Sequence, residues 1–358
     1  MQIPLFYRPK ALFGLDVGRT TVKIAQLKVA RGQPQVIGYG YGRFDKTAAH
    51  EGELVKPELI AEVIRDITNQ TIIGHITTNR IAASIPIAHS YVRVLKLPSL
   101  SQTDLLEAVK LEAEQYVPIP SQELYIEHRV LAAPKAASGA KEKTISVLMV
   151  AVPKKIVGSY LALFDLLKLE VASIEPNMFA NLRAIDFNCQ TQGAKIVIDF
   201  GAHSSDMAIY DNGVVKLTST VATGGDHITA TIAKALNLTY EQATQLKIHY
   251  GIAKSRWQAQ LATALQPILS DFASEVQKMM RYFHEHTPQA AIDQIVVVGG
   301  GANMPGLSDF LSHLTGVGVL VCNPWTNLVL KPLQPPNPAE TTIFATAVGL
   351  ALKELDKS

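Results

Sequence analysis

Two separate stretches of this sequence combine residue types that suit a bound phosphate and its metal ion. Each begins with an aspartate that ends an apolar run, and a glycine with several small or hydroxyl residues follows. The stretches, called here the first turn and the second turn, are Asp16-Val17-Gly18-Arg19-Thr20-Thr21 and Asp199-Phe200-Gly201-Ala202-His203-Ser204-Ser205. Glycine lets a tight turn expose its amide groups to an anion, and carboxylates together with water molecules bind Mg²⁺. The chemistry predicted is the binding of a nucleotide polyphosphate with Mg²⁺.

The residues of the two turns have separate predicted roles. Phosphate contacts are expected from Gly18, Arg19, Thr20, Thr21 and Lys23 on one side, and from Gly201, Ala202, His203 and Ser204 on the other. Asp16 and Asp199 are expected to hold Mg²⁺ through its water molecules. A single Asp-x-Gly also occurs in ordinary hairpin turns, so one copy alone is weak evidence. Two copies in a repeated unit are stronger evidence, because they would face each other across a cleft.

The flanking residues indicate that both turns belong to the same kind of β-hairpin. The apolar runs beside the turns are residues 12–17, 22–27, 196–200 and 206–210. Asp16 precedes Lys23 by seven residues, and Asp199 precedes Asp206 by the same spacing. A further Asn-Gly turn at 212–213 is a strong hairpin signal. Two copies of one unit predict an α/β fold of duplicated domains around a nucleotide cleft.

Three further groups of residues are predicted to lie in this cleft. They are the pair Gly224 and Gly225, the run Gly299, Gly300, Gly301 and Ala302, and the pair Glu275 and Lys278. The first pair begins an expected helix, whose amides suit an anion. The glycine run follows a buried strand, where bare backbone would let a purine and its ribose approach. The charged pair suits ribose hydroxyls and the purine edge. A plain turn or helix cap is the alternative for the glycines, and a solvated helix face for the charged pair.

Apolar periodicity predicts several helices and an insert between the two repeats. Helices are expected at residues 57–69, 103–116, 153–168, 226–236, 240–249, 261–286 and 342–355. The insert is expected to contain strands at 81–85, 91–97, 124–132 and 144–152, packed with the helices at 103–116 and 153–168. Residues 133–143 are rich in alanine, glycine, serine and lysine, which indicates a mobile hairpin loop.

Composition excludes several classes of function. With 33 basic and 31 acidic residues, the net charge of +2 gives no electrostatic case for nucleic acid. The longest apolar run, residues 145–152, is far below the roughly 20 residues that a membrane-spanning helix needs, and the first residues do not resemble a signal peptide. Cys189 and Cys322 are expected to be buried thiols in a reducing compartment. A cytoplasmic protein without direct membrane insertion is therefore predicted.

Together these motifs resemble the actin-like ATPase superfamily, whose fold is ribonuclease H-like. Within it, the sequence is similar to the PilM family of type IV pilus assembly proteins, with the cell-division protein FtsA as a neighbouring branch. The matching stretches are residues 12–23, 96–98, 111–120, 174–180, 199–205, 224–229 and 299–307. The segment Glu-Ala-Glu-Gln-Tyr-Val-Pro at 112–118 is the most specific to this branch. The resemblance extends from about residue 11 to about residue 350.

The resemblance implies a set of subdomain boundaries. Subdomain 1A would comprise residues 1–85, completed by 171–195 and the C-terminal helix 342–358. Residues 86–170 would form the inserted α+β subdomain 1C, of the SHS2 type. Subdomain 2A would comprise 196–225 and 287–341, and subdomain 2B would comprise 226–286.

The resemblance also implies ATP and Mg²⁺ as ligands and a place in the pilus assembly platform. In the family, a groove beside subdomain 1C receives the N-terminal cytoplasmic peptide of the inner-membrane protein PilN. The family also contacts the pilus motor ATPases, and self-association is a further expectation. Glu175 stands where relatives place the residue that orients the attacking water, although a helix cap beside Pro176 is the alternative. We expect ATP binding with at most slow hydrolysis.

Arg19 and His203 are unusual at their positions in such turns; Arg19 suits a phosphate contact, and His203 is expected to be a neutral turn residue. The main alternative is an FtsA-like divisome or filament-forming protein. Such proteins normally end in a detached amphipathic membrane helix, and none is recognised after Lys353. A sugar or acetate kinase is disfavoured, because the insert is apolar rather than lined with sugar-binding groups.

Overall fold

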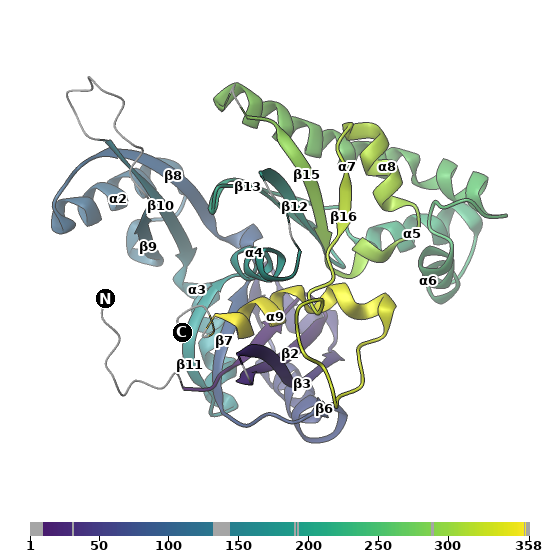
Figure 1. Cartoon of the computed structure of the whole chain (residues 1–358), viewed down its shortest axis with the longest axis horizontal. Coiled ribbons are helices and arrows are strands. Elements are labelled where there is room, and N and C mark those ends of the chain that lie inside the picture. The colour runs from purple at the N-terminus through teal and green to yellow at the C-terminus, as the bar shows by residue number, and fades with distance from the viewer. Residues whose placement is uncertain are drawn as a thin grey trace.

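The chain forms two sheet-based domains side by side, with a smaller sheet projecting from the first (Figure 1). The structure is a computed structural model that describes residues 10–355 except 31, 132–143, 190, 192, 288–289 and 354. The predicted hairpin loop at 133–143 lies outside the described residues.

The first domain is built on a six-stranded sheet with the strand order β11-β7-β1-β2-β3-β6. These strands span Glu170–Pro176, Arg80–Ile85, Phe13–Val17, Thr21–Ala30, Gln33–Arg43 and Ile73–Gly74. Strands β1, β2 and β3 form an antiparallel meander, and β7 and β11 continue the sheet in parallel. Helices α1 (Pro57–Asp66) and α3 (Lys154–Leu166) bury one face of this sheet. Helix α9 (Ala345–Leu352) covers the other face.

The second domain repeats this arrangement with the strand order β14-β13-β12-β15-β16. These strands span Val214–Val221, Ser205–Asp211, Ala194–Phe200, Ile292–Val298 and Val319–Val321. Three antiparallel strands are again continued by two parallel ones. Asp16 lies opposite Lys23 in the β1–β2 pair, and Asp199 lies opposite Asp206 in the β12–β13 pair. The predicted duplication is therefore confirmed down to the strand register.

One apolar core joins the second sheet to the helices on its outer face. These helices are α5 (Gly225–Leu236), α6 (Tyr240–His249), α7 (Gln258–His286) and α8 (Leu307–Thr315). Phe272 of α7 packs on Phe200 of β12, with ring centroids 5.2 Å apart. The segments predicted as 2A and 2B therefore share one core. Within the described ranges, no helix is both long and apolar enough to cross a bilayer.

A layer of two helices lies between the sheets (Figure 1). Met178 and Leu182 of α4 (Asn177–Asn188) share a core with Val197 of β12, and α4 packs on α9, which covers the first sheet. Gly349 of α9 crosses α4 at a point where a Cβ would overlap the Ala180 carbonyl. Glycine at this position lets the helices approach closely and connects the two domains.

The insert is a three-stranded antiparallel sheet with the order β8-β10-β9, spanning Tyr91–Pro98, Thr144–Pro153 and Leu124–Val130. Helix α2 (Gln102–Tyr116) packs against it. Residues 81–85 form β7 of the first sheet, which agrees with the boundary of subdomain 1A at residue 85 and not with a strand of the insert. The helix predicted in the insert at 153–168 instead packs as α3 in the first domain. The reason is that α3 buries Tyr160 and Phe164 in the core of the first sheet.

The two cysteines form a disulfide, Cys189–Cys322, across 133 residues of sequence. Both residues are buried as expected, but the prediction of separate thiols is wrong. Cys189 caps the end of α4, and Cys322 follows β16. The bond therefore ties the helical layer to the second sheet, a tertiary contact that sequence spacing does not reveal.

Candidate functional site

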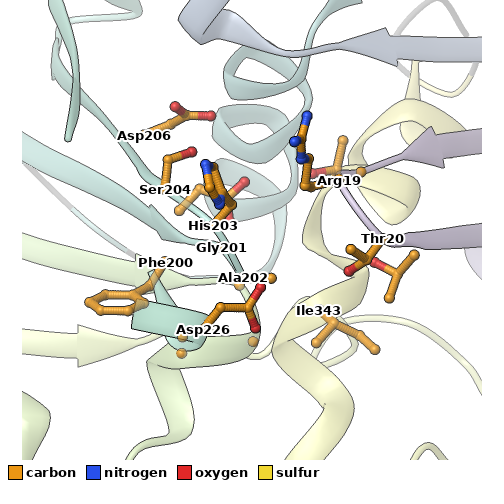
Figure 2. Close-up of a pocket in the computed structure, with 18 of the residues that line it drawn as sticks. Arg19, Thr20, Phe200, Gly201, Ala202, His203, Ser204, Asp206, Asp226 and Ile343 are labelled. Atoms are coloured by element: carbon orange, nitrogen blue, oxygen red, sulfur yellow. The ribbon is translucent and has the colours of Figure 1, made fainter. Parts of the chain in front are cut away.

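A cavity of about 1030 Å³ opens between the two sheets at the carboxyl ends of their parallel strands. Both turns line it, and Figure 2 shows Arg19 and Thr20 across the cleft from Gly201, His203 and Ser204. The crevice at this edge of an open α/β sheet is the usual position for a ligand. The structure thus brings the two sequence-predicted turns together in one cleft.

The two turns have the same local geometry. The Gly18 amide donates to the Thr21 carbonyl at 2.8 Å, and the Gly201 amide donates to the Ser204 carbonyl at 3.0 Å. The two amides inside each turn have no hydrogen-bond partner among the described residues. Two pairs of free N–H groups therefore border the cleft, as an anion site requires.

Asp16 lies at the buried end of the first turn. Its carboxylate accepts a hydrogen bond from Ser84 Oγ at 2.8 Å and pairs with Lys23 Nζ at 3.0 Å. Lys23 also lies under the turn, because a Cβ built on Gly18 would be 3.1 Å from Nζ. Ser84 is a member of the site that sequence reasoning missed, since no motif connects it with a position 68 residues earlier.

Asp199 occupies the equivalent place in the second turn. It accepts hydrogen bonds from Asn181 Nδ2 at 2.8 Å and Asn177 Nδ2 at 3.4 Å, both from α4. Burial raises the pKa of Asp199 to about 6; the negative charges of Asp206 and Asp16 act in the same direction, against the Asn181 hydrogen bond. A positive charge beside Asp199 would offset its repulsion from the neighbouring carboxylates of Asp206 and Asp16.

The chemistry of this carboxylate group fits a hydrated divalent cation. Asp16, Asp199 and Asp206 line the cleft, and Lys23 is paired with only the first of them. In the described part of the chain, no three His, Cys, Asp or Glu side chains are grouped to ligate a metal directly. A Mg²⁺ ion keeps several of its water molecules in most protein sites, so Asp16 and Asp199 would hold it through water.

Replacing Asp199 by asparagine is expected to stabilise the ligand-free protein at neutral pH. The folded-state pKa of about 6 lies above the ordinary value of 3.8, so ionisation of this carboxyl opposes folding. That cost is absent below the ordinary pKa, complete above the raised one, and at most about 3 kcal/mol. Urea unfolding of both proteins should show a difference at about pH 8 that disappears near about pH 4. An equal difference at both pH values would contradict the assignment.

The start of α5 makes a different contact from the one predicted. The amides of Gly225 and Asp226 donate to the carbonyls of Gly201 and Ala202, at 2.9 and 2.7 Å. This part of the prediction is corrected, because the first amides of the helix hold the second turn instead of a free anion. A Cβ on Gly224 would lie 2.5 Å from the Ala202 carbonyl, so glycine permits this docking. Gly225 lines the cleft, and Gly224 lies behind it.

The glycine run after β15 forms one wall of the cleft. Gly299 has a φ of 87°, and a Cβ there would lie 2.5 Å from Asp199 Oδ1. Gly300 and Gly301 also line the cavity, and Ile343 is the nearest neighbour of a Cβ on Gly300, at 3.6 Å. Ala302 is buried in the core and is not among the cavity-lining residues. The bare glycine backbone beside Ile343 leaves room for a planar ring.

Two cations in the cleft were not predicted. Lys247 reaches it from α6 and donates to the Gly225 carbonyl at 2.8 Å, and burial lowers the pKa of Lys247. Arg43 lines the cleft at the end of β3. Arg19 and Arg43 have no salt-bridge partner among the described residues. Neither Lys247 nor Arg43 belongs to a recognisable motif, so only the packing of α6 and β3 reveals them.

Glu175 does not occupy the predicted catalytic position. It lies in β11, before the start of α4, and is absent from the cavity lining. Its carboxylate binds Arg183 at 2.8 and 3.2 Å and Lys353 Nζ at 2.8 Å. Burial raises the pKa of Glu175, but Arg183 and Lys353 outweigh burial and leave it lowered. The predicted water-orienting role is corrected to a structural ion pair that connects β11, α4 and the end of α9.

Glu275 and Lys278 also lie outside the cavity lining. They form an ion pair with each other on an exposed part of α7. The side of α7 toward the sheet carries apolar residues such as Phe272 and Val276, so the charged pair remains in solvent. The predicted ribose contact is therefore replaced by the alternative interpretation, a solvated helix face.

Comparison with solved structures confirms the predicted actin-like fold. A chain of a PilM-PilN type IV pilus biogenesis complex matches with a TM-score of 0.82 at 20% identity, covering 97% of this chain and 99% of that one. MreB 5 of Spiroplasma citri bound to AMPPNP matches with a TM-score of 0.50 at 12% identity, covering 98% of each chain.

Sequence comparison places the chain in a family. Cell division protein FtsA of Enterococcus faecalis is 22% identical over 336 residues, covering 84% of this chain and 76% of that protein. Shorter matches span only 14% and 32% of two other FtsA proteins. A family model described as type IV pilus assembly protein PilM matches residues 14–355. The chain belongs to the PilM family of type IV pilus assembly proteins.

Proposed function

We propose that the cleft binds ATP with Mg²⁺. The observation that carries this proposal is the pair of equivalent turns, which have unpaired amides and line one cleft together with Asp16, Asp199 and Asp206. The structural likeness to MreB 5 of Spiroplasma citri, which is bound to AMPPNP, supports a nucleotide of this type.

The proposed contacts follow from the geometry of the cleft. The first-turn residues with Lys23, and residues 201–204 of the second turn, bind the phosphates, while Asp16 and Asp199 hold Mg²⁺ through water. Gly299, Gly300 and Gly301 form the wall for adenosine, and the amine of Lys247 is placed for the ribose or the phosphates. We expect hydrolysis to be at most slow, and Glu175, which binds Arg183 and Lys353, takes no part in the proposed contacts.

Within type IV pilus assembly, the chain would bind the N-terminal cytoplasmic tail of PilN and connect it to the pilus motor ATPases. The likeness to a PilM-PilN complex supports PilN as the partner. This partner would hold the protein at the cytoplasmic face of the inner membrane.

The insert offers a surface for the PilN tail. A shallow hollow of about 380 Å³ is lined by Glu114 and residues 117–122 at the end of α2. Tyr116 beside it is 46% exposed, and its ring lies 3.4 Å from the Arg93 guanidinium carbon. Exposed aromatic side chains beside a hollow are common anchors for peptides.

Calorimetry with a synthetic PilN-tail peptide tests this function. The purified protein should bind the peptide, and Tyr116→Ala should weaken binding by about tenfold or more, as expected for an aromatic anchor. Tyr282→Ala is the matched control, since Tyr282 is also an exposed tyrosine but lies on α7. Titrations with and without Mg-ATP show whether the nucleotide acts as a switch. If Tyr116→Ala binds the peptide as tightly as Tyr282→Ala does, the docking site does not include Tyr116 and lies elsewhere.

The FtsA matches favour one alternative, a divisome or filament-forming role. Wild-type protein that ignores the peptide in both nucleotide states, but forms filaments with Mg-ATP in sedimentation and electron microscopy, would support that alternative.

A further inference from the structure

His89 is a cleft residue to which the sequence analysis assigned no role. It ends the short 3₁₀ turn Ile87–His89 between β7 and β8, and its amide donates to the Pro86 carbonyl at 3.2 Å. The side chain is half-buried and lines the same cavity as both turns. An imidazole thus stands in the proposed nucleotide cleft.

The hairpin turn of β4 (Ala49–His50) and β5 (Glu53–Leu54) holds the His89 ring in place. Gly52 in this turn has a φ of 80°, and a Cβ there would collide with the imidazole carbons of His89. The ring therefore packs directly on the glycine backbone. A side chain at position 52 would displace it.

Charged groups around His89 come from three other parts of the chain. Asp206 belongs to β13, Glu51 to the β4–β5 turn, and Arg19 to the first turn. Burial lowers the pKa of His89, Asp206 and Glu51 raise it, and Arg19 lowers it again, with a lowered pKa as the result. Near neutral pH the ring is uncharged and can accept a proton.

Asp206 is itself fixed in position. Thr220 Oγ1 donates to it at 2.8 Å, and Asn177 Nδ2 donates at 3.1 Å. The same Asn177 amide reaches Asp199 at 3.4 Å, so the surroundings of His89 are joined to the second turn. Figure 2 shows Asp206 and Arg19 on opposite sides of the cleft. The charges of Asp206 and Arg19 both act on His89, which lines the same cavity as the turns proposed to hold the phosphates.

We propose that His89 is the general base of slow ATP hydrolysis. The inference rests on the proposed binding of Mg-ATP. His89 takes a proton from a water molecule while the water oxygen bonds to the γ-phosphorus. The bond from that phosphorus to the β–γ bridging oxygen breaks, and its electron pair stays on ADP. The imidazolium then returns its proton to solvent. This base replaces the role that Glu175 does not fill.

The test measures phosphate release and Mg-ATP affinity for the full-length protein and its variants. His89→Asn should lower kcat by about 100-fold, within the usual range for loss of a general base, and change the dissociation constant by less than about threefold. At saturating Mg²⁺, which keeps Asp199 ionised, the wild-type rate should fall as pH drops through the His89 pKa, and this acid limb should vanish in His89→Asn. Gly52→Ala, which leaves the imidazole present but displaced, should also slow kcat. His284→Asn, at an exposed histidine of α7, is the control without effect.

Several results would overturn the assignment. An unchanged kcat in His89→Asn, or an unchanged acid limb, would exclude His89 as the base. A parallel loss of affinity and rate would make it a binding residue. Wild-type protein that binds Mg-ATP but releases no phosphate above the background would refute this inference alone, whereas absence of Mg-ATP binding would refute the proposed function itself.

Discussion

Lys23→Met is expected to weaken Mg-ATP binding by roughly 10- to 100-fold, corresponding to the loss of about 1.5–3 kcal/mol for charge-assisted hydrogen bonds. Lys23 Nζ lies 3.0 Å from Asp16 and directly beneath the first turn, where the phosphates are proposed to bind. Methionine keeps most of the side-chain volume but removes the charge. Isothermal calorimetry of the two proteins measures the change.

A second ion-paired lysine controls for the loss of an ion pair. Lys195 pairs with Asp186 at 3.2 Å and lies outside the cleft lining. Lys195→Met should lower stability, because it removes the ion-pair partner of Asp186, and leave Mg-ATP affinity unchanged. Equal affinity losses in both variants would show that Lys23 acts through stability and not through phosphate contact.

Reduction of the Cys189–Cys322 disulfide is expected to lower the free energy of unfolding by up to about 4–5 kcal/mol, the chain-entropy value for a loop of more than 100 residues. The bond closes a loop across 133 residues and connects the end of α4 with the end of β16. These are the points at which the chain enters and leaves the second sheet, so the crosslink restrains the unfolded chain strongly.

Guanidinium unfolding with and without reductant measures this effect. The double variant Cys189→Ser/Cys322→Ser is the matched control, because its midpoint should equal that of the reduced wild type and should not respond to reductant. A wild-type midpoint that is unchanged by complete reduction, verified by thiol titration, would contradict the expected contribution.

The fold could be predicted largely because its signals are local and repeated. Asp16 and Lys23 share a spacing with Asp199 and Asp206, and both pairs lie directly opposite each other across a hairpin. A turn of fixed length sets such a register, so the duplication can be recognised in the sequence from the repeated spacing. The chemistry of the two turns follows from the same local rule.

The errors arise where tertiary packing decides. A proline after Glu175 indicates a helix start, but strand β11 extends through Pro176 and directs the glutamate to Arg183 and Lys353. Glu275 faces solvent because the apolar face of α7 packs on the sheet, and a short motif does not show which face that is. His89, Lys247 and Ser84 reach the cleft from elements that no short motif connects. The Cys189–Cys322 pairing is likewise a consequence of the folded arrangement.

The most direct test of the central claim is a calorimetric titration of the wild-type protein with ATP in the presence of Mg²⁺. The account predicts one site per chain, weakened roughly 10- to 100-fold in Lys23→Met and also weakened when Mg²⁺ is removed by a chelator. Absence of binding by wild-type protein with an intact folded signal, or binding that Lys23→Met leaves unchanged, would contradict the assignment of the cleft as a nucleotide site.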